Sequence, residues 1–151
     1  VGLDLLTTAE AALIELAALA TRLREIGVAD TNSTNSAADT AALNAEAISV
    51  SDSIDDIVSS MKFHSLALLG TGSTTHDIVK DLDGNTTSIK TTTGIAATNV
   101  TDATGANTTA DTALTSITTS LGHVAGGISA LSGYKNISNS LSTNILAIFR
   151  L

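Results

Sequence analysis

The chain has 151 residues, enough for one domain with a sizeable core, and its net charge of -8 excludes a nucleic-acid binder, which needs a basic surface. Hydrophobic residues make up 43% of the chain but aromatic residues only 2%, so Ala, Leu, Ile and Val must form the core, which favours packed helices over a deep ligand pocket. The sequence lacks Cys and Pro, which excludes disulfide and thiolate chemistry and permits long unbroken helices.

The first predicted helix covers about residues 3–29. Its apolar residues form two adjoining rows, one with spacings of three and four and one with a spacing of seven, which together form a wide apolar face. A two-stranded coiled coil needs a narrower face, so we expect this helix to contact more than one neighbour. The two rows are Leu6, Ala9, Leu13, Leu16, Ala20, Leu23 and Gly27, and Leu5, Ala12, Leu19 and Ile26.

A turn and a second helix are predicted next. Residues 30–36 are rich in Asn and Ser, whose side chains compete for backbone hydrogen bonds and favour loops. Ser36 and Asp39 have the spacing of a capping box, which marks the start of a helix. The helix covers about residues 37–60, and its apolar row has a period of about 3.5 residues, typical of helices that wrap around each other. That row is Leu43, Ala47, Val50, Ile54, Ile57 and Met61.

A small antiparallel β unit is predicted from about residue 63 to residue 93. The helical pattern is lost there, and the β-prone segments 77–82 and 86–91 flank Asp83-Gly84-Asn85, which is a short-range hairpin signal. A loop that starts at Asp81 faintly resembles a calcium-binding loop. Its Gly84 stands at the fourth place of that loop, however, whereas the calcium-binding pattern has Gly at the sixth. The hairpin is therefore the preferred interpretation.

A surface connection over residues 94–109 and a third helix over about residues 110–148 complete the chain. The connection is rich in Thr, Ala, Asn and Gly. The long helix carries one continuous apolar row, but its many Ser, Thr and Gly residues give it poor intrinsic propensity, so packing must hold it. The predicted fold class is therefore mainly α, with a small β-hairpin unit beside an elongated bundle of three long helices.

No catalytic, cofactor or metal site is predicted. His64, His76 and His123 are far apart in the sequence and lack the accompanying ligands that a zinc site needs. No G-x-S-x-G motif supports a nucleophilic Ser among the many hydroxyl residues. Several N-x-S/T triplets leave N-linked and O-linked glycosylation open, because attachment depends on the transferases that the protein meets.

Several segments of the N-terminal half resemble bacterial flagellin. The family has T-T-E-G-A-L-x-E, R-V-R-E-L and N-S-T-N-S in this order, and residues 8–15, 22–26 and 32–36 match these motifs. The register holds without a gap through residues 44–46, which match the family's Q-A-E, to Phe63, which matches the Phe of Q-F-N-G.

Two further features bear on this resemblance. Residues 120–124 resemble the L-G-A-V motif that opens the C-terminal rod helix of the family, and Asp83-Gly84 falls where the family has a hairpin. The chain departs from the family at His64-Ser65, where flagellins have Asn-Gly, and at Gly126-Gly127, where they have Asn-Arg.

The resemblance implies that residues 1–151 form a single rod domain of a structural subunit of the flagellar filament, which self-assembles by rod packing and serves motility. The alternative is a hook–filament junction protein of the same superfamily, but the N-S-T-N-S and R-x-R-E segments favour the filament subunit. An enzyme is not expected, since the connection is too short to hold an inserted catalytic domain. Flagellins also form an inner coiled coil from both termini; those segments lie outside this sequence, so the chain alone is not expected to form filaments.

The resemblance also assigns a contact surface to Arg22, Arg24, Glu25, Ile26 and Glu46. In flagellins this helix surface lies between subunits, and the animal Toll-like flagellin receptor binds the same surface on free monomers. We expect the subunit contact to be the main role and receptor binding a secondary one. From the residues alone, the same charges predict ion pairs on a solvated helix.

The expected partners are other flagellin subunits, with a flagellar chaperone and the filament cap as further partners. The resemblance places the protein outside the cell, in the bacterial flagellum, after export through the flagellar apparatus without a cleaved signal peptide. No nucleic-acid or membrane partner is expected, because the chain is acidic and no apolar run reaches the ~18 residues of a membrane span. No cofactor is expected.

Overall fold

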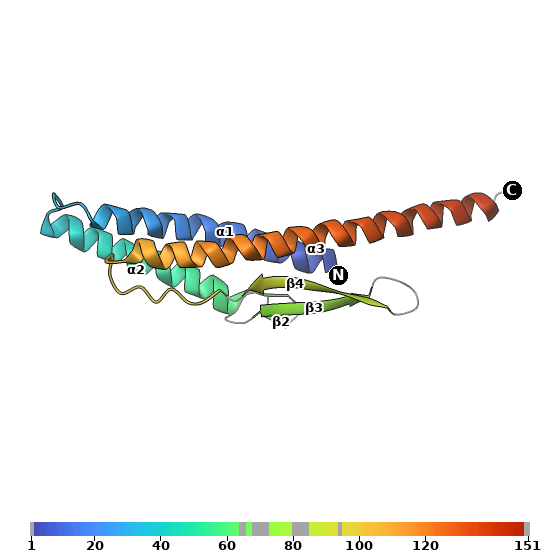
Figure 1. Cartoon of the computed structure of the whole chain (residues 1–151), viewed down its shortest axis with the longest axis horizontal. Helices are drawn as coiled ribbons and strands as arrows, with labels where there is room; N and C mark the ends of the chain where they lie inside the picture. Colours follow the sequence, from blue (N-terminus) through green and yellow to red (C-terminus); the bar gives the residue numbers. More distant parts are fainter. Residues whose placement is uncertain (1, 64–65, 68–72, 80–84, 94, 150–151) are drawn as a thin grey trace.

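Three long helices and a β-hairpin form the chain in the computed structural model (Figure 1). The helices are α1 (Gly2–Asp30), α2 (Ala37–Ser60) and α3 (Ala106–Phe149), and they lie along a common long axis with the hairpin beside α3. The predicted fold class is confirmed. The structure describes residues 2–63, 66–67, 73–79, 85–93 and 95–149.

The helix α1 forms the centre of the core. Both of its apolar rows are largely buried, and α1 packs against α2 on one side and α3 on the other, as its wide apolar face predicts. Full burial of a Leu side chain contributes about 1.5–3 kcal/mol, so this face is a main source of stability. The largest fully buried side chains of α1 are Leu6, Leu13, Leu16, Leu23 and Ile26.

The turn between α1 and α2 ends in the capping box that its sequence predicts. The backbone N–H of Asp39 donates to Ser36 Oγ at 3.1 Å, and the backbone N–H of Ser36 donates to Asp39 Oδ2 at 2.9 Å. This second bond stabilises the charged carboxylate and lowers the pKa of Asp39 below its ordinary value of 3.8. The cap therefore fixes where α2 begins.

Two antiparallel strand pairs follow α2. The short strands β1 (Lys62–Phe63) and β2 (Leu66–Ala67) pair with each other, and β3 (Ser73–Val79) pairs with β4 (Thr86–Thr93). The hairpin strand β3 begins four residues earlier than the predicted strand 77–82, because the β-prone Ser-Thr-Thr run joins it through an irregularity between Thr74 and Thr75. The predicted turn residues Asp83 and Gly84 lie outside the described residues.

The connection from β4 to α3 is an extended segment, residues 95–105, which we call the strap. It lies along α2 and is partly built into the core, since Ile95 and Ala103 are fully buried. The strap ends at Gly105, whose φ of +71° lies in the left-handed region that favours glycine. The helix α3 begins directly afterwards at Ala106, four residues before the predicted start.

The packing of α1 against α3 is closest at Gly27. A Cβ atom at this position would overlap the backbone nitrogen of Asn107 and come within 2.9 Å of the Ala106 carbonyl carbon. Glycine is therefore required here by the approach of two backbones.

The helix α3 has a packed half and a free half. Its last described buried residue is Leu131, and the helix then runs on past the start of α1 and past the described part of the hairpin (Figure 1). We call residues 132–149 the free half. In the described part of the chain, no helix combines the length and the apolar character needed to cross a membrane.

Candidate subunit-contact surface

The four charged residues of the predicted surface lie on the outside of the bundle. Arg22, Arg24 and Glu25 are exposed on α1, one turn before its end, and Glu46 is half-buried on the neighbouring α2. The structure brings Arg22 together with Glu25 and Glu46 within one chain, whereas Arg24 pairs with α3, and the role of this surface in subunit contact stays a prediction.

Arg22 joins α1 to α2. Its Nε donates to Glu46 Oε1 at 2.6 Å, and its Nη1 lies 3.3 Å from Glu25 Oε2. The hydrogen bond to Glu46 raises the pKa of Arg22 above its ordinary value, with a smaller contribution from Glu25. The guanidinium is half exposed, so this pair orients the surface more than it stabilises the fold.

Arg24 joins α1 to α3. Its Nε lies 2.9 Å from Asp111 Oδ1, near the start of α3. Sequence reasoning did not include Asp111 in the surface, because no local pattern connects a residue of the third helix to Arg24. The two arginines of α1 therefore hold one neighbouring helix each.

Ile26 does not belong to this surface. Its side chain is 1% exposed and lies in the core, next to the close approach of α1 and α3 at Gly27. The expected surface role of Ile26 is therefore wrong. The apolar row that contains Ile26 faces inward, as its periodicity indicated.

A polar contact that the sequence did not reveal fixes the strap to α2. Asp55 Oδ1 accepts the backbone N–H of Thr98 at 2.7 Å and the Thr98 hydroxyl at 3.0 Å, and Asp55 Oδ2 accepts the backbone N–H of Asn99 at 3.2 Å. Asn99 has a φ of +48°, a conformation that Asn tolerates better than most residues. One carboxylate thus satisfies three donors of the strap.

Two further residues of α2 extend this contact. Ser51 Oγ lies 2.7 Å from the Thr98 hydroxyl and accepts the backbone N–H of Val100 at 3.0 Å. Asn44 Oδ1 accepts the backbone N–H of Ala103 at 2.9 Å. Together with Asp55 these side chains sit at spacings of seven and four on one face of α2, and that spacing was the available sequence signal.

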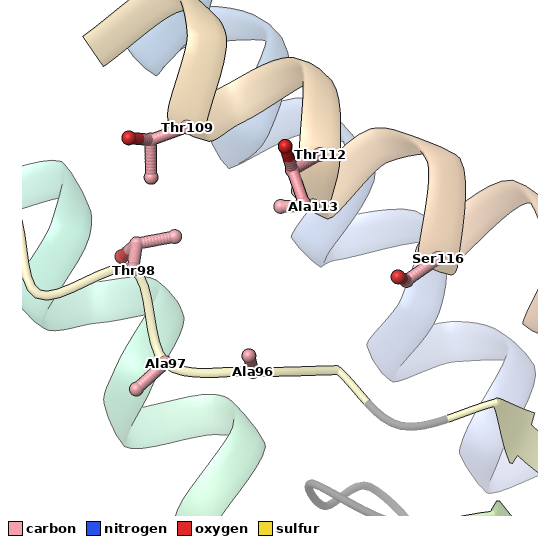
Figure 2. A pocket seen from close by; sticks show the side chains of 7 residues that line it. All are labelled: Ala96, Ala97, Thr98, Thr109, Thr112, Ala113 and Ser116. Atoms are coloured by element: carbon pink, nitrogen blue, oxygen red, sulfur yellow. The ribbon is translucent and has the colours of Figure 1, made fainter. Parts of the chain in front are cut away.

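A hollow of about 410 Å³ separates the strap from α3 (Figure 2). Its walls are small alanine side chains and short hydroxyl side chains, and the Thr112 hydroxyl donates to the carbonyl oxygen of Thr108 at 3.2 Å. Among the described residues, no charged group lines it. The lining residues are Ala96, Ala97, Thr98, Thr109, Thr112, Ala113 and Ser116.

The histidines do not come together in the part of the chain that the structure describes. His76 lies in β3, opposite Ile89 of β4, and His123 is half-buried on α3. His64 lies outside the described residues. Over these described ranges, no group of three or more His, Cys, Asp or Glu residues could hold a metal ion.

The comparisons with known proteins agree with the geometry. A profile of the bacterial flagellin N-terminal helical region matches residues 1–74. The comparison with curated proteins found no match. Among solved structures, Bacillus cereus flagellin is similar over 94% of this chain and 85% of its own, with a TM-score of 0.58 and 23% sequence identity. Residues 1–74 therefore belong to the N-terminal helical region of the bacterial flagellin family, and the chain as a whole has the flagellin fold.

Proposed function

We propose that this protein is a structural subunit of a bacterial flagellar filament, and that residues 1–151 act as its single rod domain. The observation that carries the proposal is the flagellin N-terminal match over α1 and α2, in a chain whose three helices form an elongated bundle. The subunit works by self-assembly for motility, without catalysis. It acts outside the cell, after export through the flagellar apparatus.

The contact surface of this subunit consists of Arg22, Arg24, Glu25 and Glu46. Intrachain pairs hold these side chains in fixed positions, while roughly half of each arginine remains open to a neighbour. Such a preorganised surface loses less side-chain entropy on association. Secondary partners of the subunit are a flagellar chaperone, the filament cap and the animal Toll-like flagellin receptor.

Complementation of a motile bacterium that lacks its own flagellin tests the function. The full natural gene is expected to restore filaments in electron micrographs and swimming in soft agar. Arg22→Glu is expected to impair both, and Arg22→Glu with Glu46→Arg to restore them in part. Glu15→Arg, an exposed charge change elsewhere on α1, is the matched control.

The outcome separates this function from its alternative. Exported, folded protein without any filament would overturn the proposal. A few copies at the hook, with no filament beyond them, would identify a hook–filament junction protein instead. The N-terminal flagellin match supports the filament subunit.

A further inference from the structure

The turn between α1 and α2 contains two Asn-Ser pairs. They are Asn32-Ser33 and Asn35-Ser36, so each asparagine is followed by the same small residue. Asparagine is a labile residue, because the backbone amide of the next residue can attack its side-chain carbon, and a small next residue leaves room for that attack. The two pairs are therefore chemically alike, and only the fold distinguishes them.

The fold protects the second pair. The backbone N–H of Ser36 donates to Asp39 Oδ2 at 2.9 Å in the capping box, so this nitrogen is engaged. The side-chain Nδ2 of Asn35 donates to the carbonyl oxygen of Ala29 at 2.9 Å, which fixes the amide group in place. Both reacting groups of this pair must therefore break a hydrogen bond before they can react.

Other asparagines are protected in the same way. In the strap, Asn99 is followed by Val100, whose backbone N–H donates to Ser51 Oγ at 3.0 Å. The asparagines inside α2 and α3 are followed by amides that take part in helical hydrogen bonds. The attacking nitrogen is engaged at each of these positions.

The first pair of the turn lacks this protection. Asn32 and Ser33 are exposed, and among the described residues the Ser33 N–H has no hydrogen-bond acceptor. Asn32 Oδ1 accepts the backbone N–H of Thr34 at 3.0 Å and the Thr34 hydroxyl at 2.8 Å. The backbone bond closes a small ring that includes the side-chain Cγ atom and the Ser33 nitrogen. The side-chain amide is therefore folded back toward the nitrogen that attacks it.

We propose that Asn32 is a site of spontaneous deamidation that the turn itself promotes. The Ser33 amide loses its proton to solvent base, and its nitrogen forms a bond to Cγ of Asn32. Negative charge develops on Oδ1, where the two donors of Thr34 stabilise it as an oxyanion hole does. The side-chain nitrogen takes up a proton and leaves as ammonia, which gives a succinimide. Water then opens this ring to aspartate or isoaspartate.

The product changes both the charge and the backbone of the turn. A carboxylate replaces a neutral amide, so the net charge changes by one unit from -8 to -9. In isoaspartate the main chain also passes through Cβ, which disrupts the turn that the Asn35 N–H now closes on the carbonyl oxygen of Asn32 at 3.2 Å. The turn thus becomes more acidic as the protein ages. This inference concerns the chemistry of the turn and holds whatever the protein assembles into.

Peptide mapping by mass spectrometry tests the proposal. The folded protein is incubated at mildly alkaline pH, and trypsin then releases residues 25–62 as one peptide that carries both pairs. Fragmentation assigns the conversion of amide to acid to each asparagine and distinguishes isoaspartate from aspartate. We expect Asn32 to convert about tenfold faster than Asn35, because the Ser36 amide must first lose a hydrogen bond. Isoaspartate should be among the products, since direct hydrolysis of the side chain gives aspartate alone.

The same measurement in concentrated urea is the control for sequence. Without the fold, the two Asn-Ser pairs should convert at similar rates. Equal rates in the folded protein, faster conversion at Asn35, or aspartate without isoaspartate would each overturn the proposal.

Two variants separate the contributions of the turn. Thr34→Val removes the hydroxyl donor and keeps the backbone N–H, so conversion at Asn32 should slow about threefold. Asp39→Ala frees the Ser36 amide and should bring the rate at Asn35 closer to that at Asn32. Circular dichroism checks that both variants keep their helices. Folded variants in which neither rate changes would show that these hydrogen bonds do not control the reaction and would overturn the proposal.

Discussion

The two halves of α3 have similar compositions but different surroundings. In the packed half a side chain is buried at every third or fourth position, whereas the free half has no buried side chain among those the structure describes. Both halves are rich in Ser, Thr and Gly, and hydroxyls bond back to the preceding turn in both, as in Thr115 to Asp111 and Thr143 to Asn139. The buried row of the packed half is Ala106, Ala110, Ala113, Ile117, Ser120, Val124, Gly127 and Leu131.

The two halves therefore differ in packing and not in intrinsic propensity. A sequence with the same low propensity forms one side of the core where the described part of α1 covers it, and exposes apolar groups such as Ile137 beyond that part. Substitutions that act on one half of α3 only can test this difference in packing.

The largest effect is expected at Ile117. Ile117→Ala removes a side chain that is 1% exposed and leaves a cavity, so the free energy of unfolding should fall by about 3 kcal/mol. Ile137→Ala makes the same change in the free half and should cost less than about 0.5 kcal/mol. Urea denaturation followed by circular dichroism measures both. Equal losses would show that the free half is also packed in solution and would contradict the difference in packing between the two halves.

The next effect concerns the contact that begins the packed half. Gly27→Ala places a Cβ against the backbone of α3, which must shift, and we expect a loss of about 2 kcal/mol. Gly122→Ala, where a Cβ meets nothing within 4 Å, should instead stabilise by about 0.5–1 kcal/mol. Thermal unfolding of the two variants should therefore shift in opposite directions, and a tolerated Gly27→Ala would contradict the close approach.

A smaller loss is expected at the strap. Asp55→Ala leaves three donors of the strap without their acceptor, which should cost about 1.5 kcal/mol. Asp56→Ala removes a neighbouring exposed carboxylate and should be nearly neutral. Hydrogen exchange should then show faster exchange at the amides of Thr98 and Asn99 in the first variant. Unchanged exchange there would show that the carboxylate does not hold the strap.

The smallest effect is expected from pH at the capping box. The folded-state pKa of Asp39 lies below its ordinary value of 3.8, so its contribution is present above that pH and is lost as the pH falls through the folded pKa. Asp39→Asn should therefore flatten the pH dependence of stability below about pH 4. An acid titration of the two proteins by circular dichroism checks this, and curves of identical shape would count against the cap.

The helices could be predicted because their apolar residues repeat with a local period. The same periodicity placed Ile26 in an inward row, and the structure shows it there, whereas the resemblance alone placed it on the surface. The strap contacts of Asp55 and the pairing of Arg24 with Asp111 could not be predicted. They join residues far apart in the sequence, so even the spacing of Asn44, Ser51 and Asp55 on α2 marks a polar face of that helix without naming the residues it binds.

The start of α3 was predicted too late for a related reason. Residues 106–109 are Ala-Asn-Thr-Thr, which read as loop by composition, but burial of Ala106 against α1 draws them into the helix. The glycine that ends the strap lies directly before them, and its positive φ fixes the boundary.

The central position of α1 has a consequence for the order of folding. Its apolar face is closed chiefly by α3, which lies at the other end of the sequence, so the contacts that complete the core have high contact order. A chain that emerges N-terminus first therefore leaves the side of α1 that α3 covers exposed until about residue 131 has followed. During that interval the segment depends on staying extended or on being shielded, and the core is completed late, after α3 has been added.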